Sequence, residues 1–202
     1  MTRRFAVTFD YLCPFARNAH EHVLAGLQGG ADWEVTFRPY SLVQGHVEED
    51  ATAVWDRRAP FATPGVLALA AGVAVRDRQP EHFAATHRSL FAARHDRGQD
   101  ITDAEVVRGA LERAGVDGTA LLGSLEEGEV LAQLRAEHEA GVEAHGVWGV
   151  PTFIGGDRAA FVRLLDRPEE DPGPSIAAVE QVVDLLEGQR NLHEFKQTDL
   201  PV

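Results

Sequence analysis

The stretch FAVTFDYLCPFA at residues 5–16 joins a strand pattern directly to the start of a helix. Every second residue from Phe5 to Phe9 is large and apolar, which is the period of a β-strand. Pro14 suits the first turn of a helix, because the N–H that proline lacks is not needed there. An apolar helical stripe continues to Leu27, and a second alternating pattern follows at 33–37. These patterns predict a β-α-β unit with parallel strands and a right-handed crossover.

The middle of the chain carries helical periodicity. An acid-rich segment, 46–60, is expected to be an irregular connector, and Thr102 with Glu105 has the spacing of a capping box. The predicted helices are Pro64–Val75, Pro80–Ala93, Asp103–Ala114 and Glu129–His145.

Strand signals return only near the C-terminal end. Residues 151–164 predict a hairpin that turns at Gly155-Gly156, followed by a loop at 167–174 and a helix over 176–188. The order of elements predicts an α/β fold: a thioredoxin-like mixed sheet formed by 1–59 and 147–202, with an all-helical domain inserted at 60–146.

Two short motifs resemble those of the DsbA family of thioredoxin-fold oxidoreductases. The turn FDYLCPFA at residues 9–16 resembles the strand-to-helix active-site turn of that family, and GVPTF at 149–153 resembles its loop with a cis-proline facing the reactive thiol. The resemblance implies that Cys13 is the catalytic nucleophile. It also implies that the Val150–Pro151 backbone holds a bound peptide or thiol conjugate.

General chemistry also points to Cys13. A thiol at a helix N-terminus lies near unpaired N–H groups and the positive end of the helix dipole, so we expect a pKa below about 8.5. Arg17, on the same helical face, is expected to stabilise the thiolate, and Asp10 to oppose it if ionised nearby. The alternative is that Cys13 is a small buried apolar residue.

The remaining substrate contacts are assigned around these motifs. Tyr11, Phe15 and Trp148 are expected to form the apolar walls of the substrate groove, with Trp148 as a core residue the alternative, and Pro14 is expected to contact the substrate.

The sequence departs from the family pattern at one position. Ala16 stands where DsbA-type enzymes carry their second cysteine, and no other cysteine exists, which excludes an internal disulfide cycle. A low-molecular-weight thiol must then resolve Cys13, as a co-substrate with no bound cofactor required. Cys13 could attack a mixed disulfide and take up the small thiol, or it could be oxidised to a sulfenic acid that small thiols reduce. The small thiol would be mycothiol in a GC-rich bacterium of actinobacterial type, and glutathione or bacillithiol elsewhere. The single Lys196 among plentiful arginine and alanine favours such a source.

Two other functions stay open. The group of 2-hydroxychromene-2-carboxylate isomerase and kappa-class glutathione transferases shares the fold and uses a serine in a similar turn and a bound glutathione. The chain also resembles FrnE-like proteins. The chain could also be a redox-inactive module that binds a peptide or small molecule beside Pro151. The sequence does not decide whether the chain forms a homodimer.

Composition limits the partners. A net charge of −13 argues against nucleic acid and anionic membrane surfaces. A lone cysteine and no signal-peptide pattern predict a cytoplasmic protein. His138 and His145 are too far apart on one helix to share a metal ion, and His20, on an apolar stripe, is expected to be a hydrogen-bonded core residue. We expect no metal site.

Overall fold

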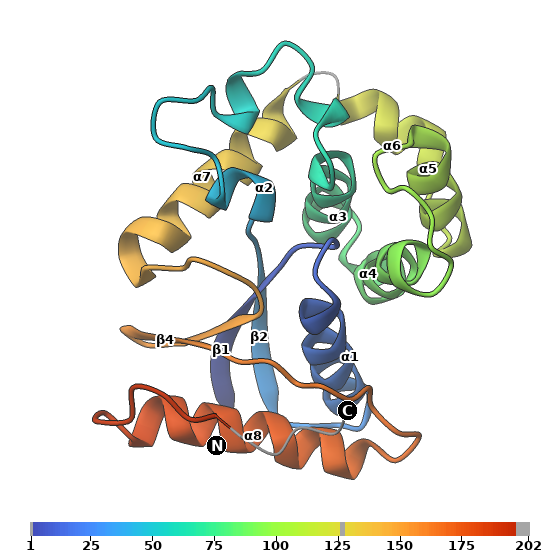
Figure 1. The fold of residues 1–202 in the computed structure, drawn as a ribbon. Coiled ribbons are helices and arrows are strands. Elements are labelled where there is room, and N and C mark those ends of the chain that lie inside the picture. Colours follow the sequence, from blue (N-terminus) through green and yellow to red (C-terminus); the bar gives the residue numbers. More distant parts are fainter. Residues whose placement is uncertain (1, 126–127, 197–202) are drawn as a thin grey trace.

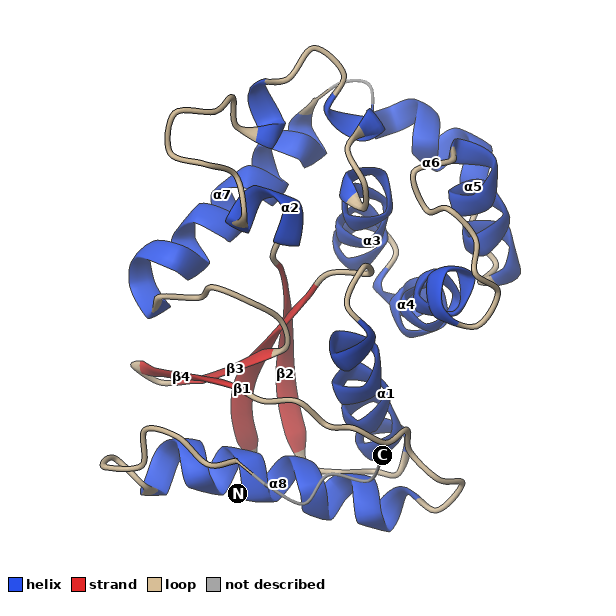
Figure 2. Cartoon of the chain, viewed as in Figure 1, coloured by secondary structure: helices blue, strands red, loops and turns tan. Residues whose placement is uncertain are grey.

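A mixed four-stranded sheet forms the centre of the fold (Figure 2). The computed structural model describes residues 2–125 and 128–196. In the order β2-β1-β3-β4, β1 pairs parallel with β2 and antiparallel with β3, and β4 pairs antiparallel with β3. The strands are β1 Arg3–Phe9, β2 Trp33–Pro39, β3 Thr152–Gly155 and β4 Arg158–Phe161. The β-α-β unit and the hairpin predicted from the sequence are confirmed, and with them the α/β thioredoxin-like fold.

Three helices flank this sheet (Figure 1). Helix α1 spans Pro14–Gln28 and packs against α8, Pro172–Gly188, which also contacts β3 and β4. Helix α7, Glu129–His145, contacts β2. The apolar stripe of α1 therefore lies inside, with its first turn at the end of β1.

The remaining helices gather at the end of β1 and β2 from which α1 begins (Figure 1). They are α2 Leu42–Gly45, α3 Val66–Arg78, α4 Pro80–His95, α5 Ala104–Arg113 and α6 Gly118–Ser124, with single 3₁₀ turns at Val54–Asp56 and Pro60–Ala62. The four long helices predicted for the middle of the chain are confirmed as α3, α4, α5 and α7. The short helices α2 and α6 were not predicted. Among the described helices, none combines the length and the apolar content that crossing a bilayer requires.

Two local predictions were wrong. The N-cap of α5 is Asp103, whose carboxylate accepts the Glu105 N–H at 2.9 Å, and Thr102 instead donates its own N–H to Asp100. A carboxylate makes a stronger cap at this position, because its charge also complements the helix dipole. Helix α8 likewise begins within the predicted loop, capped by Asp171 and opened by Pro172.

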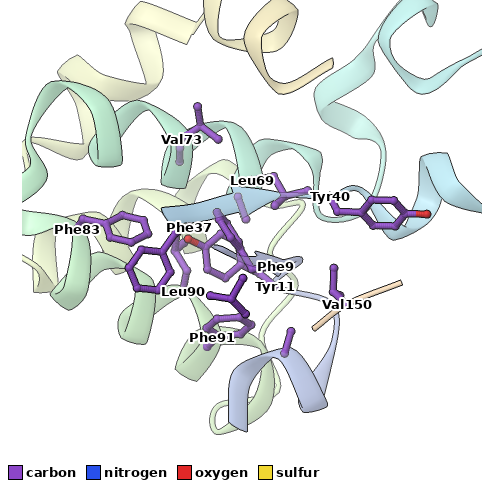
Figure 3. Packing of buried hydrophobic residues seen from close by; sticks show 14 of the residues in the cluster. Phe9, Tyr11, Phe37, Tyr40, Leu69, Val73, Phe83, Leu90, Phe91 and Val150 are labelled. Atoms are coloured by element: carbon purple, nitrogen blue, oxygen red, sulfur yellow. The ribbon is translucent and has the colours of Figure 1, made fainter. Parts of the chain in front are cut away.

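The apolar core is continuous from the sheet into the helices. Figure 3 shows Phe9 and Tyr11 among side chains from β2, α3 and α4. Helix α3 is buried at every position from Val66 to Val75, so it serves as the central helix of this region. At Gly72, a β-carbon would lie 2.3 Å from the Tyr11 hydroxyl, so only glycine allows α3 to approach so closely.

Candidate active site

Cys13 is the residue at which β1 turns into α1. Its N–H donates to the Asp10 carbonyl at 3.1 Å, and its backbone is extended, with φ −94° and ψ 119°. The side chain acts as the N-cap, since Sγ accepts the Ala16 N–H at 3.4 Å. Cys13 is 8% exposed, so the sulfur lies just below the surface at the helix N-terminus.

The loop before β3 faces this sulfur from the opposite side. The Val150–Pro151 peptide bond is cis. Thr152 holds the loop in place: its N–H donates to Thr8 Oγ1 at 2.9 Å, and its hydroxyl donates to the Gly149 carbonyl at 2.8 Å. The thiol of Cys13 donates to the Val150 carbonyl across 3.2 Å. Two motifs 137 residues apart in the chain thus meet at one sulfur.

The expected fall in the pKa of Cys13 is wrong. Burial of the thiol raises its pKa above the ordinary value, because a thiolate would lose its hydration. The N–H groups of Ala16 and Phe15 and the guanidinium of Arg163 lower the pKa, and the Asp10 carboxylate raises it, as expected. The helix N-terminus does favour the thiolate, but burial outweighs it. The resting side chain is the thiol.

Asp10 is a buried carboxylate three residues before Cys13. Its carboxylate accepts N–H groups from Leu12 at 2.9 Å and from Leu42 at 2.7 Å. Burial raises its pKa to about 6, and these two hydrogen bonds limit the rise. Asp10 therefore fixes the turn to the start of α2 and carries a negative charge near the sulfur at neutral pH.

Arg17 does not stabilise the thiolate, contrary to the sequence prediction. Its guanidinium pairs with Glu21, 3.3 Å away on the next turn of α1, and with Asp96 after α4. Arg167 binds the same two carboxylates. Because Glu21 is itself buried, these ion pairs hold Arg17 within the contact between α1 and α4. Glu21 lies four residues after Arg17, a spacing that could have revealed this pair, whereas Asp96 is distant in sequence and no pattern along α1 could reveal it.

Arg163 is the cation that acts on Cys13 instead. It follows β4, and its guanidinium carbon lies 5.2 Å from the centre of the Phe15 ring. No local pattern distinguishes this arginine in the sequence. Only the pairing of the hairpin with β1 brings it to the start of α1.

Tyr11 does not line a groove, contrary to the sequence prediction. It is fully buried and lies among Phe37, Leu90 and Phe91 (Figure 3). Its hydroxyl is 2.9 Å from His87 Nδ1. The side chain therefore anchors the catalytic turn to α4.

A chain of hydrogen bonds continues from Tyr11 through two buried histidines. His87 Nε2 is 2.9 Å from His20 Nδ1, and His20 Nε2 is 3.0 Å from the Thr8 carbonyl. A carbonyl only accepts, so His20 Nε2 carries a proton and Nδ1 accepts from His87 Nε2. His87 Nδ1 must then accept from the Tyr11 hydroxyl. With both rings neutral, the Tyr11 hydroxyl and one ring N–H of each histidine all donate a hydrogen bond. His20 is therefore a hydrogen-bonded core residue, as predicted.

The side chains at the surface of the site are proline and aromatic residues. Pro14 is exposed and Phe15 half-buried. Trp148 is 66% exposed and packs on Phe161 with ring centres 4.6 Å apart, so it is not a core residue. The Val150 side chain is buried, which leaves its carbonyl as the group that Val150 presents to the sulfur.

An open cavity of about 490 Å³ lies along α2, close to this turn. Its lining is mostly apolar, and one wall, Leu42, is bonded through its N–H to Asp10. The lining residues are Leu42, Val43, His46, Val47, Ala51 and Arg57. Within the described ranges, no group of three or more histidine, cysteine or acidic side chains could hold a metal ion.

Comparison with solved structures places this arrangement in a known fold. BdbD from Bacillus subtilis aligns with a TM-score of 0.60 at 13% identity, over 90% of this chain and 85% of that one. The thiol-disulfide exchange protein alpha-DsbA2 from Wolbachia pipientis gives 0.59 at 16%, over 90% and 80%. 2-Hydroxychromene-2-carboxylate isomerase gives 0.59 at 16%, over 78% and 88%.

Sequence comparison gives the family. No curated protein sequence matches the chain significantly. Residues 6–169 match the DSBA-like thioredoxin domain family, a range that includes both the Cys13 turn and the cis-proline loop. The chain therefore belongs to the DSBA-like thioredoxin domain family.

Proposed function

We propose that the chain is a thiol-dependent oxidoreductase that acts through Cys13 alone and uses a low-molecular-weight thiol as its resolving partner. The observation that carries the proposal is the position of the Cys13 sulfur, between the Ala16 N–H at the start of α1 and the Val150 carbonyl beside Pro151. The resemblance to the family implies that the first of these segments carries the nucleophile and that the second supplies the backbone that binds the substrate.

The reaction is two successive thiol–disulfide exchanges. The Cys13 thiolate attacks a mixed disulfide between the substrate and the small thiol; the substrate leaves as a thiolate and is protonated by water, and the small thiol stays bonded to Cys13. A second small-thiol anion then attacks this bond, which regenerates Cys13 and releases the small-thiol disulfide. The substrate sulfur is reduced to a thiol and one free small thiol is oxidised, so that the two small-thiol groups leave as one disulfide. Ala16 cannot take the place of the second thiol.

Substrate binding supplies the activation that the free protein lacks. In the resting state, the Cys13 thiol donates to the Val150 carbonyl, which favours the neutral form. When the backbone of a bound peptide or a thiol conjugate donates a hydrogen bond to this carbonyl, the thiol loses its acceptor. The Ala16 N–H then remains as a partner that favours the thiolate. The cavity along α2 offers apolar surface for the rest of the substrate.

Such a cycle requires a compartment that keeps the small thiol reduced. A chain with one cysteine and no internal disulfide suits the bacterial cytoplasm, where thiols stay reduced. We place the protein there.

The test is mass spectrometry of the protein after incubation with oxidised glutathione, and after purification from its native host. We expect one small-thiol adduct on Cys13 that a reduced thiol removes, and no adduct on Cys13→Ser. A Cys13 that stays free when oxidised glutathione is in excess, both alone and with substrate-like disulfide peptides present, contradicts the proposal.

The resting thiol also favours a second candidate, a thiol-dependent isomerase or transferase. A neutral Cys13 could donate a hydrogen bond to the sulfur of a bound thiol conjugate, the role that the related group gives to serine. Cys13→Ser decides between the two functions. Serine retains a donor, so conjugate binding measured by calorimetry should survive in an isomerase, whereas adduct formation and disulfide reduction should be lost in an oxidoreductase.

A further inference from the structure

We propose that Arg163 is a specificity-determining residue that binds a carboxylate of the small thiol or disulfide that reacts at Cys13. The inference rests on the proposed function and narrows the substrate class, from any small thiol to one that carries a carboxylate.

The backbone holds Arg163 at the site. The N–H of the preceding residue, Val162, donates to the Pro151 carbonyl at 3.0 Å, so this segment runs beside the cis-proline loop. From there the guanidinium reaches over the ring of Phe15, two residues after Cys13, at 5.2 Å from its centre. Arg163 thus joins the two motifs of the site across their exposed side.

The guanidinium has no acidic partner in the part of the chain that the structure describes. It lies over the Phe15 ring. This contrasts with Arg17, which is held by Glu21 and Asp96. In a protein with a net charge of −13, an exposed arginine that stays unpaired beside the reactive sulfur can bind an incoming anion. Its planar group of donors fits a carboxylate in particular.

This preference separates the candidate thiols. Glutathione carries a carboxylate at both ends and bacillithiol carries carboxylates on its malate group, whereas mycothiol carries none. Arg163 therefore favours glutathione or bacillithiol over mycothiol as the resolving thiol.

The experiment compares two alkylating reagents of nearly equal size at Cys13. Iodoacetate carries a carboxylate and iodoacetamide does not, and both need the same thiolate. The ratio of their rates thus isolates recognition of the carboxylate from the pKa of Cys13. We expect Arg163→Ala to lower the iodoacetate-to-iodoacetamide ratio by roughly three- to five-fold, as for loss of an exposed ion pair. Arg163→Lys should retain most of the preference.

The matched control is Arg113→Ala, which removes the same charge from an exposed position on α5. Its ratio should equal that of the unchanged protein. A second comparison uses oxidised glutathione and its ethyl esters, in which the carboxylates are blocked. With the unchanged protein, the esters should react more slowly than oxidised glutathione itself. With Arg163→Ala, the two should react at equal rates. Equal ratios in Arg163→Ala and Arg113→Ala overturn the inference but leave the oxidoreductase standing. Failure of Cys13 to form any disulfide adduct overturns the proposed function itself.

Discussion

At Cys13, two neighbours favour opposite states of one sulfur. The Ala16 N–H stabilises the thiolate and the Val150 carbonyl stabilises the thiol. With the sulfur largely buried, the thiol prevails and the pKa rises. A protein with a single cysteine benefits from this balance, because a resting thiol reacts slowly with oxidants in solution. The reactivity of Cys13 then depends on which group donates a hydrogen bond to the Val150 carbonyl.

Replacing Asp10 tests the electrostatic part of this balance. Asp10→Asn removes the negative charge that raises the pKa of Cys13, so the pKa should fall. The measurement is the rate of iodoacetamide alkylation against pH. Asp157→Asn, in the exposed turn of the hairpin, is the control and should leave the profile unchanged. An unaltered midpoint in Asp10→Asn would show that Asp10 does not act on the sulfur.

Ala16 offers a second test at the same scale. It is fully buried, with its N–H on the Cys13 sulfur, in the position of the second cysteine of the family. Ala16→Cys should therefore form a disulfide with Cys13 on mild oxidation. The titratable thiols of the unfolded variant would fall from two to none, and dithiol oxidase activity would appear. Cys13→Ser combined with Ala16→Cys should keep its one thiol; persistence of both thiols in Ala16→Cys would mean that the turn lacks the DsbA geometry.

At the scale of elements, the approach of α3 to the catalytic turn depends on Gly72. A β-carbon there would lie 2.3 Å from the Tyr11 hydroxyl, which is already held by His87. Gly72→Ala should therefore lower the free energy of unfolding by about 1–3 kcal/mol, the usual result of overpacking a core. Denaturation in urea measures it. Gly123→Ala, on α6 with open space around it, should instead stabilise by up to about 1 kcal/mol.

The elements differ in how far the sequence predicts them. Strand β1, helix α1 and the hairpin follow from local periodicity and from proline and glycine at their ends. Helix α6 has only seven residues, with two glycines, so its local signal is weak and its packing against α5 supports it. The pairing of Arg17 with Asp96 and the position of Arg163 depend on how distant segments fold together. The motifs therefore locate the sulfur and the cis-proline, but not the charges around them.

Across the whole molecule, buried neutral histidines connect the helical region to the sheet. His20 on α1 and His87 on α4 are joined by a hydrogen bond. His138 on α7 accepts the Ser41 N–H at 3.2 Å, beyond the end of β2. Burial lowers the pKa of His20 and of His138 to about 4 and that of His87 well below its ordinary value. The contact between α1 and α4 and the contact of α7 with the segment after β2 thus depend on uncharged rings.

This arrangement predicts that acid destabilises the fold. A histidine with a lowered folded pKa contributes stability that is present above its unfolded pKa of about 6.5 and is lost as the pH falls toward about 4. Between about pH 7.5 and about pH 5, His20 and His138 should each lower the free energy of unfolding by about 2 kcal/mol, and His87 should lower it further. Asp10 acts in the opposite direction, because a carboxyl with a raised folded pKa stabilises the fold as the pH falls. It should raise the free energy of unfolding by about 1.4 kcal/mol over the same range. The net loss should be about 3 kcal/mol or more.

Urea denaturation across this pH range measures the loss, and His138→Asn provides its sharpest test. The asparagine oxygen can accept the Ser41 N–H in place of His138 Nδ1 without titrating, so the difference between the two pH values should shrink by about 2 kcal/mol. His193→Asn, at an exposed position after α8, is the matched control and should leave the difference unchanged. A protein equally stable at both pH values, or a His138→Asn variant with the full pH dependence, would show that these rings do not remain neutral because of burial. Equal shrinkage in both variants would place the effect in the net charge of the chain and not at the contact between α7 and the segment that follows β2.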